Sequence, residues 1–237
     1  MTDSYTDELF DLGGRADVLR FPVSRLLVDP ERFREDFDEP MSERGMGAVY
    51  TKTHAGKPLK IGFDRDALLK EYYDPLHQAL EDWAAMALKE NDTCLIIDCH
   101  SFPSEPLPCD LDQSPNRPDF CIGTTAFHTS EGLVNAIKSN LEMVGHSVSI
   151  DNPYSGTIVP LLYLSNEPRV QSIMIEVNRH LYMDEKSGKK LAVFQDVQST
   201  VRMALSVAIL YQMFPKDPCE PSQPASDAKI KEFLDSL

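Results

Sequence analysis

Basic side chains are scarce in this chain. It has 23 Lys and Arg against 38 Asp and Glu, and its formal net charge is −15 at pH 7. Binding to nucleic acid needs clusters of Lys and Arg that neutralise phosphates. The composition therefore argues against a nucleic-acid partner, and an anionic small-molecule substrate would need a local basic pocket.

Long apolar runs and signal-like segments are also lacking. The longest apolar stretch, residues 203–214, is interrupted by Ser206 and Gln212 and is shorter than the roughly 20 residues that cross a bilayer. The opening residues, MTDSYTDELFDLGG, contain neither the basic segment nor the apolar segment of a secretion signal. We therefore expect a cytoplasmic protein with no membrane partner.

Paired cysteine motifs are absent as well. The five cysteines are odd in number and have no CxxC spacing. This usage is typical of reduced thiols in a cytoplasm rather than of a disulfide framework. A zinc site built from cysteines is therefore not expected.

Strand and helix patterns alternate along the chain. With 237 residues, 42% of them hydrophobic, it can bury one large core. The run Cys94–Ile97 and the segment VQSIMIEVNR are typical of buried strands, and shorter strands are expected at Phe120–Ile122 and near Val148. Helices are expected over 64–91, with a kink or break at Pro75, and over 130–144 and 191–214. The alternation predicts a three-layer α/β fold, in which a mixed, mostly parallel sheet carries helices on both faces.

The first sixty residues give less regular signals. The opening segment predicts a helix that ends at Gly13-Gly14 and places Asp3 and Asp7 on one face. Residues 18–29 predict a strand bent at Pro22, and residues 48–61 predict a hairpin. We expect one main domain over residues 1–215, followed over 216–237 by a Pro/Ser linker and a short amphipathic helix.

His100 directly follows a buried strand, in the sequence Asp98-Cys99-His100-Ser101. A strand end fixes the orientation of an imidazole, and Asp98 is placed to hold the ring of a metal-ligating histidine. One histidine does not define a metal site. A histidine that only makes hydrogen bonds at a strand end remains the alternative.

Glu176 is flanked by apolar residues in the MIEVNR segment. A carboxylate rarely enters such surroundings without a partner or a function. It is a candidate general base that activates water, or it is one half of a salt bridge with Arg179.

Other polar residues admit two interpretations each. Arg25, Arg32, Arg44 and Arg179 suit a bidentate clamp on a substrate carboxylate, but most arginines are solvated or form surface pairs. Tyr154, in the NPYSGT turn, is a candidate for stabilising an oxyanion or part of an ordinary turn. Asp3 and Asp7 are either metal ligands or residues that favour a helix N-terminus. For His77, near Pro75, we expect a structural role.

Six segments in this order resemble the N-formylglutamate amidohydrolase family over nearly the whole chain to about residue 195. They are TDSYTDELF, FPVSRLLVDPERF, EPMSERGMG, IIDCHSFPS, NPYSGT and SIMIEVNRHLYMDE. The resemblance implies a carboxypeptidase-like zinc hydrolase with a mixed-sheet α/β fold. Such enzymes cleave an N-formyl amino acid, for example N-formyl-L-glutamate, to formate and the free amino acid.

The resemblance also implies roles for individual residues. It makes His100 a ligand of Zn²⁺, or of another divalent metal, and Asp3 a second ligand. Glu176 corresponds to the catalytic base. Arg25 and Arg179, together with Asn178, are implied to bind the substrate carboxylate.

One departure from the family pattern leaves rival functions open. Family members usually carry, before the TD segment, a strand ending in a His-Ser motif that supplies another zinc ligand, whereas this chain begins at Met1-Thr2-Asp3. Zinc catalysis usually needs three protein ligands. The alternatives are a catalytically inactive binding protein that keeps an arginine pocket, or a zinc amidase or peptidase for another N-acyl substrate.

Overall fold

The computed structural model describes residues 2–214, and the linker and helix predicted over 216–237 lie outside this range. Four strands form the main sheet, in the order β1-β4-β2-β3: β1 (Cys94–Phe102), β2 (Phe120–Gly123), β3 (Val148–Ile150) and β4 (Val170–Asn178). β1 runs parallel to β4 and β2 parallel to β3, whereas β2 and β4 are antiparallel. Strands β5 (Met183–Asp184) and β6 (Lys189–Lys190) form a separate small ribbon.

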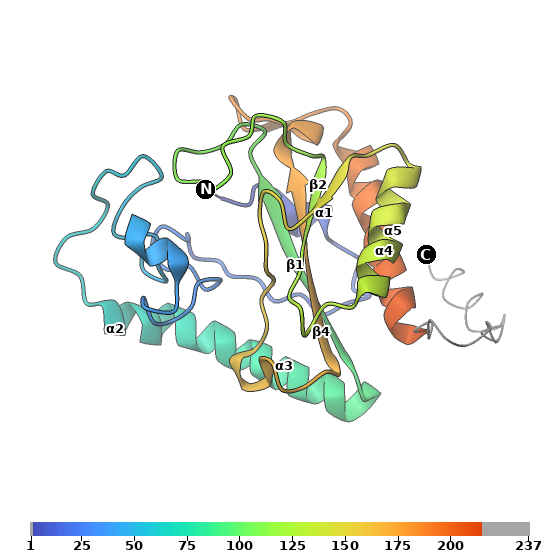
Figure 1. Ribbon diagram of the computed structural model, residues 1–237, viewed down its shortest axis with the longest axis horizontal. Coiled ribbons are helices and arrows are strands. Elements are labelled where there is room, and N and C mark those ends of the chain that lie inside the picture. Colours follow the sequence, from blue (N-terminus) through green and yellow to red (C-terminus); the bar gives the residue numbers. More distant parts are fainter. Residues whose placement is uncertain (1, 215–237) are drawn as a thin grey trace.

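Helices cover both faces of this sheet (Figure 1). Side chains alternate along a strand, so Leu95 and Ile97 of β1 face one layer of helices. That layer consists of α4 (Glu131–Met143) and α5 (Phe194–Met213), and its side chains form the largest core cluster. On the opposite face, Ala84 of α3 (Asp74–Asn91) packs in a cluster with Cys94 and Val170. The arrangement confirms the predicted three-layer, mixed and mostly parallel α/β fold.

The helices after residue 60 follow their sequence signals closely. In α4 the Ser130 side chain accepts a hydrogen bond from the Leu133 N–H and so caps the first turn. Over 64–91 the chain passes from α2 (Arg65–Leu68) through a π-helical turn, η2 (Leu69–Tyr73), into α3. Pro75 lies in the first turn of α3. A proline lacks the N–H that a continuing α-helix needs and clashes with the carbonyl four residues earlier, and the wider turn accommodates both effects.

The structure differs from three predictions for the first sixty residues. Residues 18–29 form no strand, because Pro22 removes a backbone donor and the Leu27 N–H closes a turn on the Ser24 carbonyl. Residues 48–61 turn as predicted, but their pairing is limited to one isolated bridge between Lys52 and Pro58.

The opening helix is also shorter than predicted. α1 covers only Thr6–Leu9, so Asp3 precedes it and does not share a helical face with Asp7. Within residues 2–214, no helix combines the length and the apolar character that crossing a membrane requires.

Candidate active site

Two neighbouring parallel strands bring the predicted catalytic residues together. In the register of β1 and β4, His100 lies directly opposite Glu176. Asp98 is two residues before His100 and therefore shares its face of the sheet. All three side chains are buried. The cluster lies near the carboxyl ends of β1 and β4, the edge at which α/β sheets usually bind ligands.

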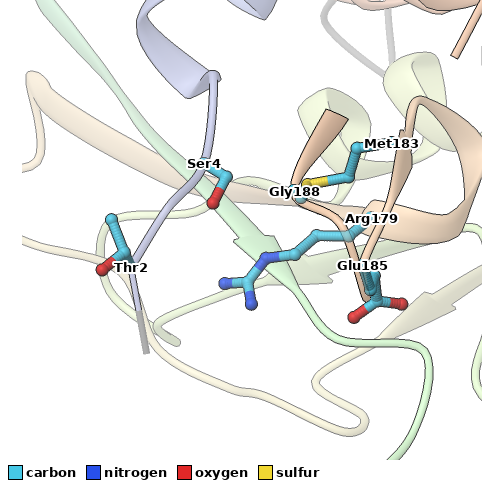
Figure 2. A pocket seen from close by; sticks show the side chains of 6 residues that line it. All are labelled: Thr2, Ser4, Arg179, Met183, Glu185 and Gly188. Atoms are coloured by element: carbon cyan, nitrogen blue, oxygen red, sulfur yellow. The ribbon is translucent and has the colours of Figure 1, made fainter. Parts of the chain in front are cut away.

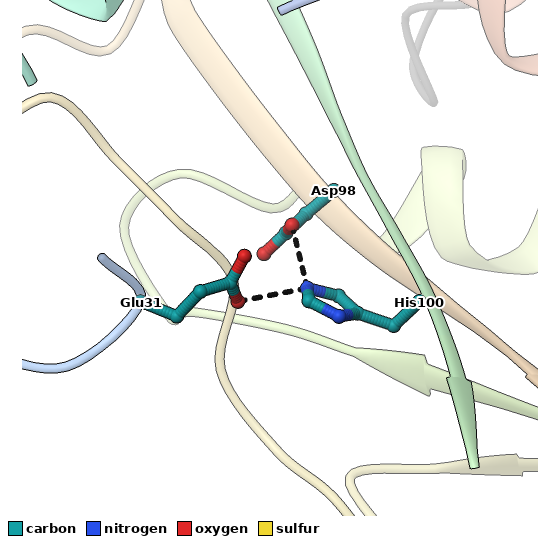
Figure 3. A group of neighbouring side chains, drawn as sticks. All are labelled: Glu31, Asp98 and His100. Carbon is teal, nitrogen blue, oxygen red and sulfur yellow. Dashed lines mark hydrogen bonds and ion pairs between the residues drawn. The ribbon is translucent and has the colours of Figure 1, made fainter. Parts of the chain in front are cut away.

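Carboxylates surround both ring nitrogens of His100. Its Nε2 lies 2.8 Å from Asp98 Oδ1 and 2.8 Å from Glu31 Oε2 (Figure 3). Its Nδ1 lies 3.5 Å from Asp3 Oδ2. Burial alone would lower the pKa of His100, but the charges of Glu31 and Asp98 raise it well above its ordinary value. The site therefore stabilises positive charge at this ring.

Asp3 is fixed by an arginine and by the end of β1. Arg25 Nη2 donates to Asp3 Oδ2 over 2.6 Å, and the Ser101 N–H donates to Asp3 Oδ1 over 2.9 Å. Although burial would raise the pKa of Asp3, Arg25 and His100 hold it well below its ordinary value. Arg25, predicted as a substrate binder, thus already carries an ion pair.

Glu31 is a site residue that the sequence did not single out. It belongs to the irregular segment before α2, where no periodic pattern marks a buried position, and its side chain remains 30% exposed. Loss of hydration and the nearby Asp98 carboxylate raise the pKa of Glu31, although His100 opposes the shift. Glu31, Asp98 and His100 present donor atoms within 4.8 Å of one another, a set that can hold a metal ion.

Glu176 occupies an unusual environment for a carboxylate. Its residue is only 8% exposed, and burial raises its pKa to about 8. Its Oε2 has no hydrogen-bond partner in the described part of the chain. The alternative salt bridge with Arg179 does not form among these residues, because Arg179 binds Ser101 instead.

Arg179 points into a cavity of about 220 Å³ (Figure 2). Its Nε donates to Ser101 Oγ over 3.1 Å and its Nη2 to the Ser101 carbonyl over 2.9 Å. The other lining residues are Thr2, Ser4, Met183, Glu185 and Gly188. Ser101 therefore links this cavity to Asp3 and, through Asp3, to His100.

Three other predicted binders have structural contacts. Asn178, 1% exposed, donates from Nδ2 to the Pro118 carbonyl. Arg44 Nη1 donates to the Cys109 carbonyl over 2.7 Å. The Tyr154 hydroxyl donates to Asp110. All three contacts hold the proline-rich loop over 103–119, and the predicted substrate contacts of these residues stay predictions.

Arg117 anchors the same loop and was missed from the sequence. Its side chain is 2% exposed and lies 2.8 Å from Asp110 Oδ2. Its Nη1 donates to the Tyr154 hydroxyl. Nothing in a loop rich in proline marks one arginine as buried, because its burial depends on the distant Phe102 and Tyr154 rings.

A family model and one solved structure indicate the same family. A family model described as N-formylglutamate amidohydrolase matches residues 1–183. The chain is similar in structure to an N-formylglutamate amidohydrolase from Ralstonia eutropha JMP134, with 21% identity, a TM-score of 0.71, and coverage of 89% of this chain and 84% of that one. A gene product from Agrobacterium tumefaciens gives 21% identity, a TM-score of 0.54, and coverage of 77% and 68%. No curated protein matches the chain.

Proposed function

The chain belongs to the N-formylglutamate amidohydrolase family, and we propose that it uses a divalent metal to hydrolyse the amide bond of an N-formyl or other N-acyl amino acid. N-formyl-L-glutamate is the first substrate to test. The observation that carries the proposal is Glu176, a buried carboxyl directly opposite His100 with one oxygen that has no hydrogen-bond partner among residues 2–214. Such a group is suited to move a proton beside a cationic centre.

The donor set around His100 fits a divalent metal. Imidazole nitrogen and carboxylate oxygen are ordinary zinc ligands. We assign the metal to the Nδ1 side, with His100 and Asp3 as ligands, because their donor atoms lie 3.5 Å apart. Two ligands of a tetrahedral zinc are separated by about 3.3 Å. When bound, zinc supplies Lewis-acid chemistry that acidifies water and polarises a carbonyl.

The Nε2 side is suited to orienting the ring. Asp98 and Glu31 lie there at hydrogen-bond distance. A metal-ligating histidine commonly directs its other nitrogen to a carboxylate, which fixes the ring and makes it a better ligand. The competing assignment places the metal at Glu31, Asp98 and His100 Nε2, the set with three protein donors.

The remaining steps belong to the chain's own residues. The ionised form of Glu176 accepts a proton from the attacking water, and the oxygen then adds to the acyl carbon. The protonated Glu176 returns this proton to the departing amine as the C–N bond breaks, giving a free amino acid and a carboxylic acid that loses its proton to solvent. Arg179 holds the substrate carboxylate in the cavity beside Ser101, and Arg25 keeps Asp3 ionised and in place.

Zinc content and formate release test this proposal. After zinc loading and dialysis, the wild-type protein should retain zinc and release formate from N-formyl amino acids. Asp3→Asn should lose most of its zinc, because the amide is a much poorer ligand. Glu31→Gln should retain zinc, with His100 less firmly oriented. Asp38→Asn, an exposed carboxylate in the same N-terminal part, is the matched control.

The pattern of loss separates the alternatives. Zinc lost in Glu31→Gln and kept in Asp3→Asn would move the metal to the Nε2 side. Binding of N-acyl amino acids without hydrolysis would identify an inactive binding protein. Hydrolysis of other N-acyl groups but not of the formyl group would identify a different amidase. If the protein neither binds nor hydrolyses N-acyl amino acids, the proposed function is contradicted altogether.

A further inference from the structure

The cavity beside Ser101 lies between two segments distant in sequence. Thr2 and Ser4 form one wall, and residues 179–188 form the other. Two hydrogen bonds join the walls: the Tyr182 hydroxyl donates to the Ser4 carbonyl and the Tyr5 hydroxyl to the Gly188 carbonyl, each over 2.7 Å. These two hydrogen bonds therefore fix the walls of the cavity relative to each other.

This cavity adjoins the groups assigned to catalysis. Ser101 accepts from Arg179 and also approaches Asp3, with 3.4 Å between Ser101 Oγ and Asp3 Oδ1. Thr2 and Ser4 flank Asp3 in the sequence. A substrate whose acyl group lies at His100 would therefore place its amino-acid part in this cavity.

The charges that line the cavity are balanced. Among the described lining residues, Arg179 is the one cation and Glu185 the one anion (Figure 2). Glu185 is held in position, because its Oε1 accepts a hydrogen bond from the Ser104 N–H over 2.9 Å. One guanidinium can neutralise one substrate carboxylate.

Two other predicted carboxylate binders are engaged elsewhere. Arg25 is paired with Asp3, and Arg44 donates to the Cys109 carbonyl. Arg179 also donates to Ser101, but it supplies the guanidinium among the described residues that line this cavity. A substrate with two carboxylates would therefore meet one guanidinium here and would bring its second negative charge towards Glu185. Like charges brought together at an interface cost binding free energy.

We propose, on the basis of the proposed function, that this cavity selects N-formyl amino acids with a single carboxylate and that Glu185 disfavours a second one. Arg179 binds the α-carboxylate, and the side chain of the substrate lies towards Glu185. A neutral hydrogen-bond donor, such as a carboxamide, suits this position because Glu185 accepts hydrogen bonds. The preferred class is thus neutral and polar rather than acidic.

Two nearly isosteric ligands test the proposal on the full chain. N-formyl-L-glutamine and N-formyl-L-glutamate differ by one amide in place of one carboxylate. Wild-type protein should bind the glutamine compound about tenfold more tightly, measured as Kd by calorimetry. The same ratio should appear in kcat/KM for formate release. Glu185→Gln should reduce both ratios to about one, because glutamine keeps the oxygen that accepts from Ser104 but carries no charge.

The control is Glu90→Gln at the end of α3. Glu90 is exposed and precedes the start of β1, at the opposite edge of the sheet from the site. The Glu90→Gln variant removes the same charge from the chain and should leave both ratios between the glutamine and glutamate compounds unchanged. A wild-type preference for the glutamate compound, or a preference for glutamine that survives in Glu185→Gln, would overturn this inference alone. Failure of both ligands to bind would overturn the proposed function with it.

Discussion

His100 is held by carboxylates that come from separate parts of the chain. Asp98 shares its strand, whereas Glu31 and Asp3 belong to the N-terminal segment. The three together make the ring a site for positive charge. Glu176, opposite the ring on β4, has the raised pKa that burial produces. At the scale of single residues, the proposed chemistry therefore has two parts: a cationic centre at His100 and a proton carrier, Glu176.

Replacing the proton carrier gives the first prediction at this scale. Glu176→Gln should lower kcat for formate release by at least about 100-fold, because an amide cannot accept the proton of water. Zinc content should stay at the wild-type level, since Glu176 is not an assigned ligand. The melting temperature should not fall, because a neutral side chain replaces a buried carboxyl whose Oε2 has no partner in the part of the chain that the structure describes.

Glu167→Gln provides the comparison for this variant. Glu167 pairs with Arg169 and precedes the start of β4, whereas Glu176 lies near the carboxyl end of that strand. Loss of the Glu167 charge should leave kcat unchanged. Activity retained in Glu176→Gln would show that another group moves the proton. Loss of zinc in that variant would instead make Glu176 a ligand.

Sequence reasoning identified candidate site residues where a local sequence pattern marks them. His100 and Glu176 are polar residues inside apolar strands, so the sequence alone marks them as candidates. Asp98 follows from the alternation of a strand. Glu31 and Arg117 lie in irregular segments, where burial is decided by contacts with distant residues. No local pattern records such contacts, which is why these two were missed.

The secondary-structure elements also divide into those that a local sequence pattern predicts and those that depend on distant contacts. β1, β4, α4 and α5 have periodic apolar faces, and each appeared close to its predicted position. The strand predicted over 18–29 did not, because apolar composition alone provides no pairing partner. Side-chain contacts hold this segment, such as the hydrogen bond that the Tyr50 hydroxyl donates to the buried Asp29 carboxylate over 2.6 Å.

The helical segment around η2 holds the backbone on both sides of Glu31. The Tyr73 hydroxyl donates to the Arg32 carbonyl over 2.9 Å, and His77 Nε2 lies 2.8 Å from the Pro30 carbonyl. The rings of Tyr73 and His77 stack 4.1 Å apart. Because the two residues are one turn apart, they share one face of the helix. The structural role expected for His77 is consistent with these contacts.

His77 gives a prediction for stability against pH. Burial lowers its pKa, and its Nδ1 has no hydrogen-bond partner among residues 2–214. The folded state therefore disfavours the charged ring. The contribution of neutral His77 to the free energy of unfolding is fully present above the pKa of about 6.5 that histidine has in the unfolded chain. It is lost as pH falls below that value, by up to about 1.4 kcal/mol per pH unit.

Comparison with His77→Gln isolates this contribution. Glutamine keeps an N–H donor for the Pro30 carbonyl but does not titrate. Denaturant unfolding between pH 7.5 and 5.5 should show the wild type losing more stability than the variant. Equal slopes would mean that His77 does not resist protonation in the folded protein.

At the scale of the whole molecule, the N-terminal segment contacts α5. Gln198 Nε2 donates to the Glu8 carbonyl and Arg202 Nε to the Asp11 carbonyl. Residues near the start of the chain thus contact α5 and also complete the candidate site through Asp3. We propose on these contacts that residues 1–215 fold as one domain.

Net charge gives the last prediction, because it acts on the whole molecule. A charge of −15 destabilises the compact state through self-repulsion, which salt screens over about 10 Å at 0.1 M. Salt also weakens ion pairs, but exposed pairs such as Arg169 with Asp92 contribute little. Raising NaCl from 10 to 200 mM, with a chelator present, should therefore raise the melting temperature by about 2–4 °C, equal to about 1 kcal/mol. KCl should act equally, and a fall in melting temperature would mean that the ion pairs outweigh the repulsion.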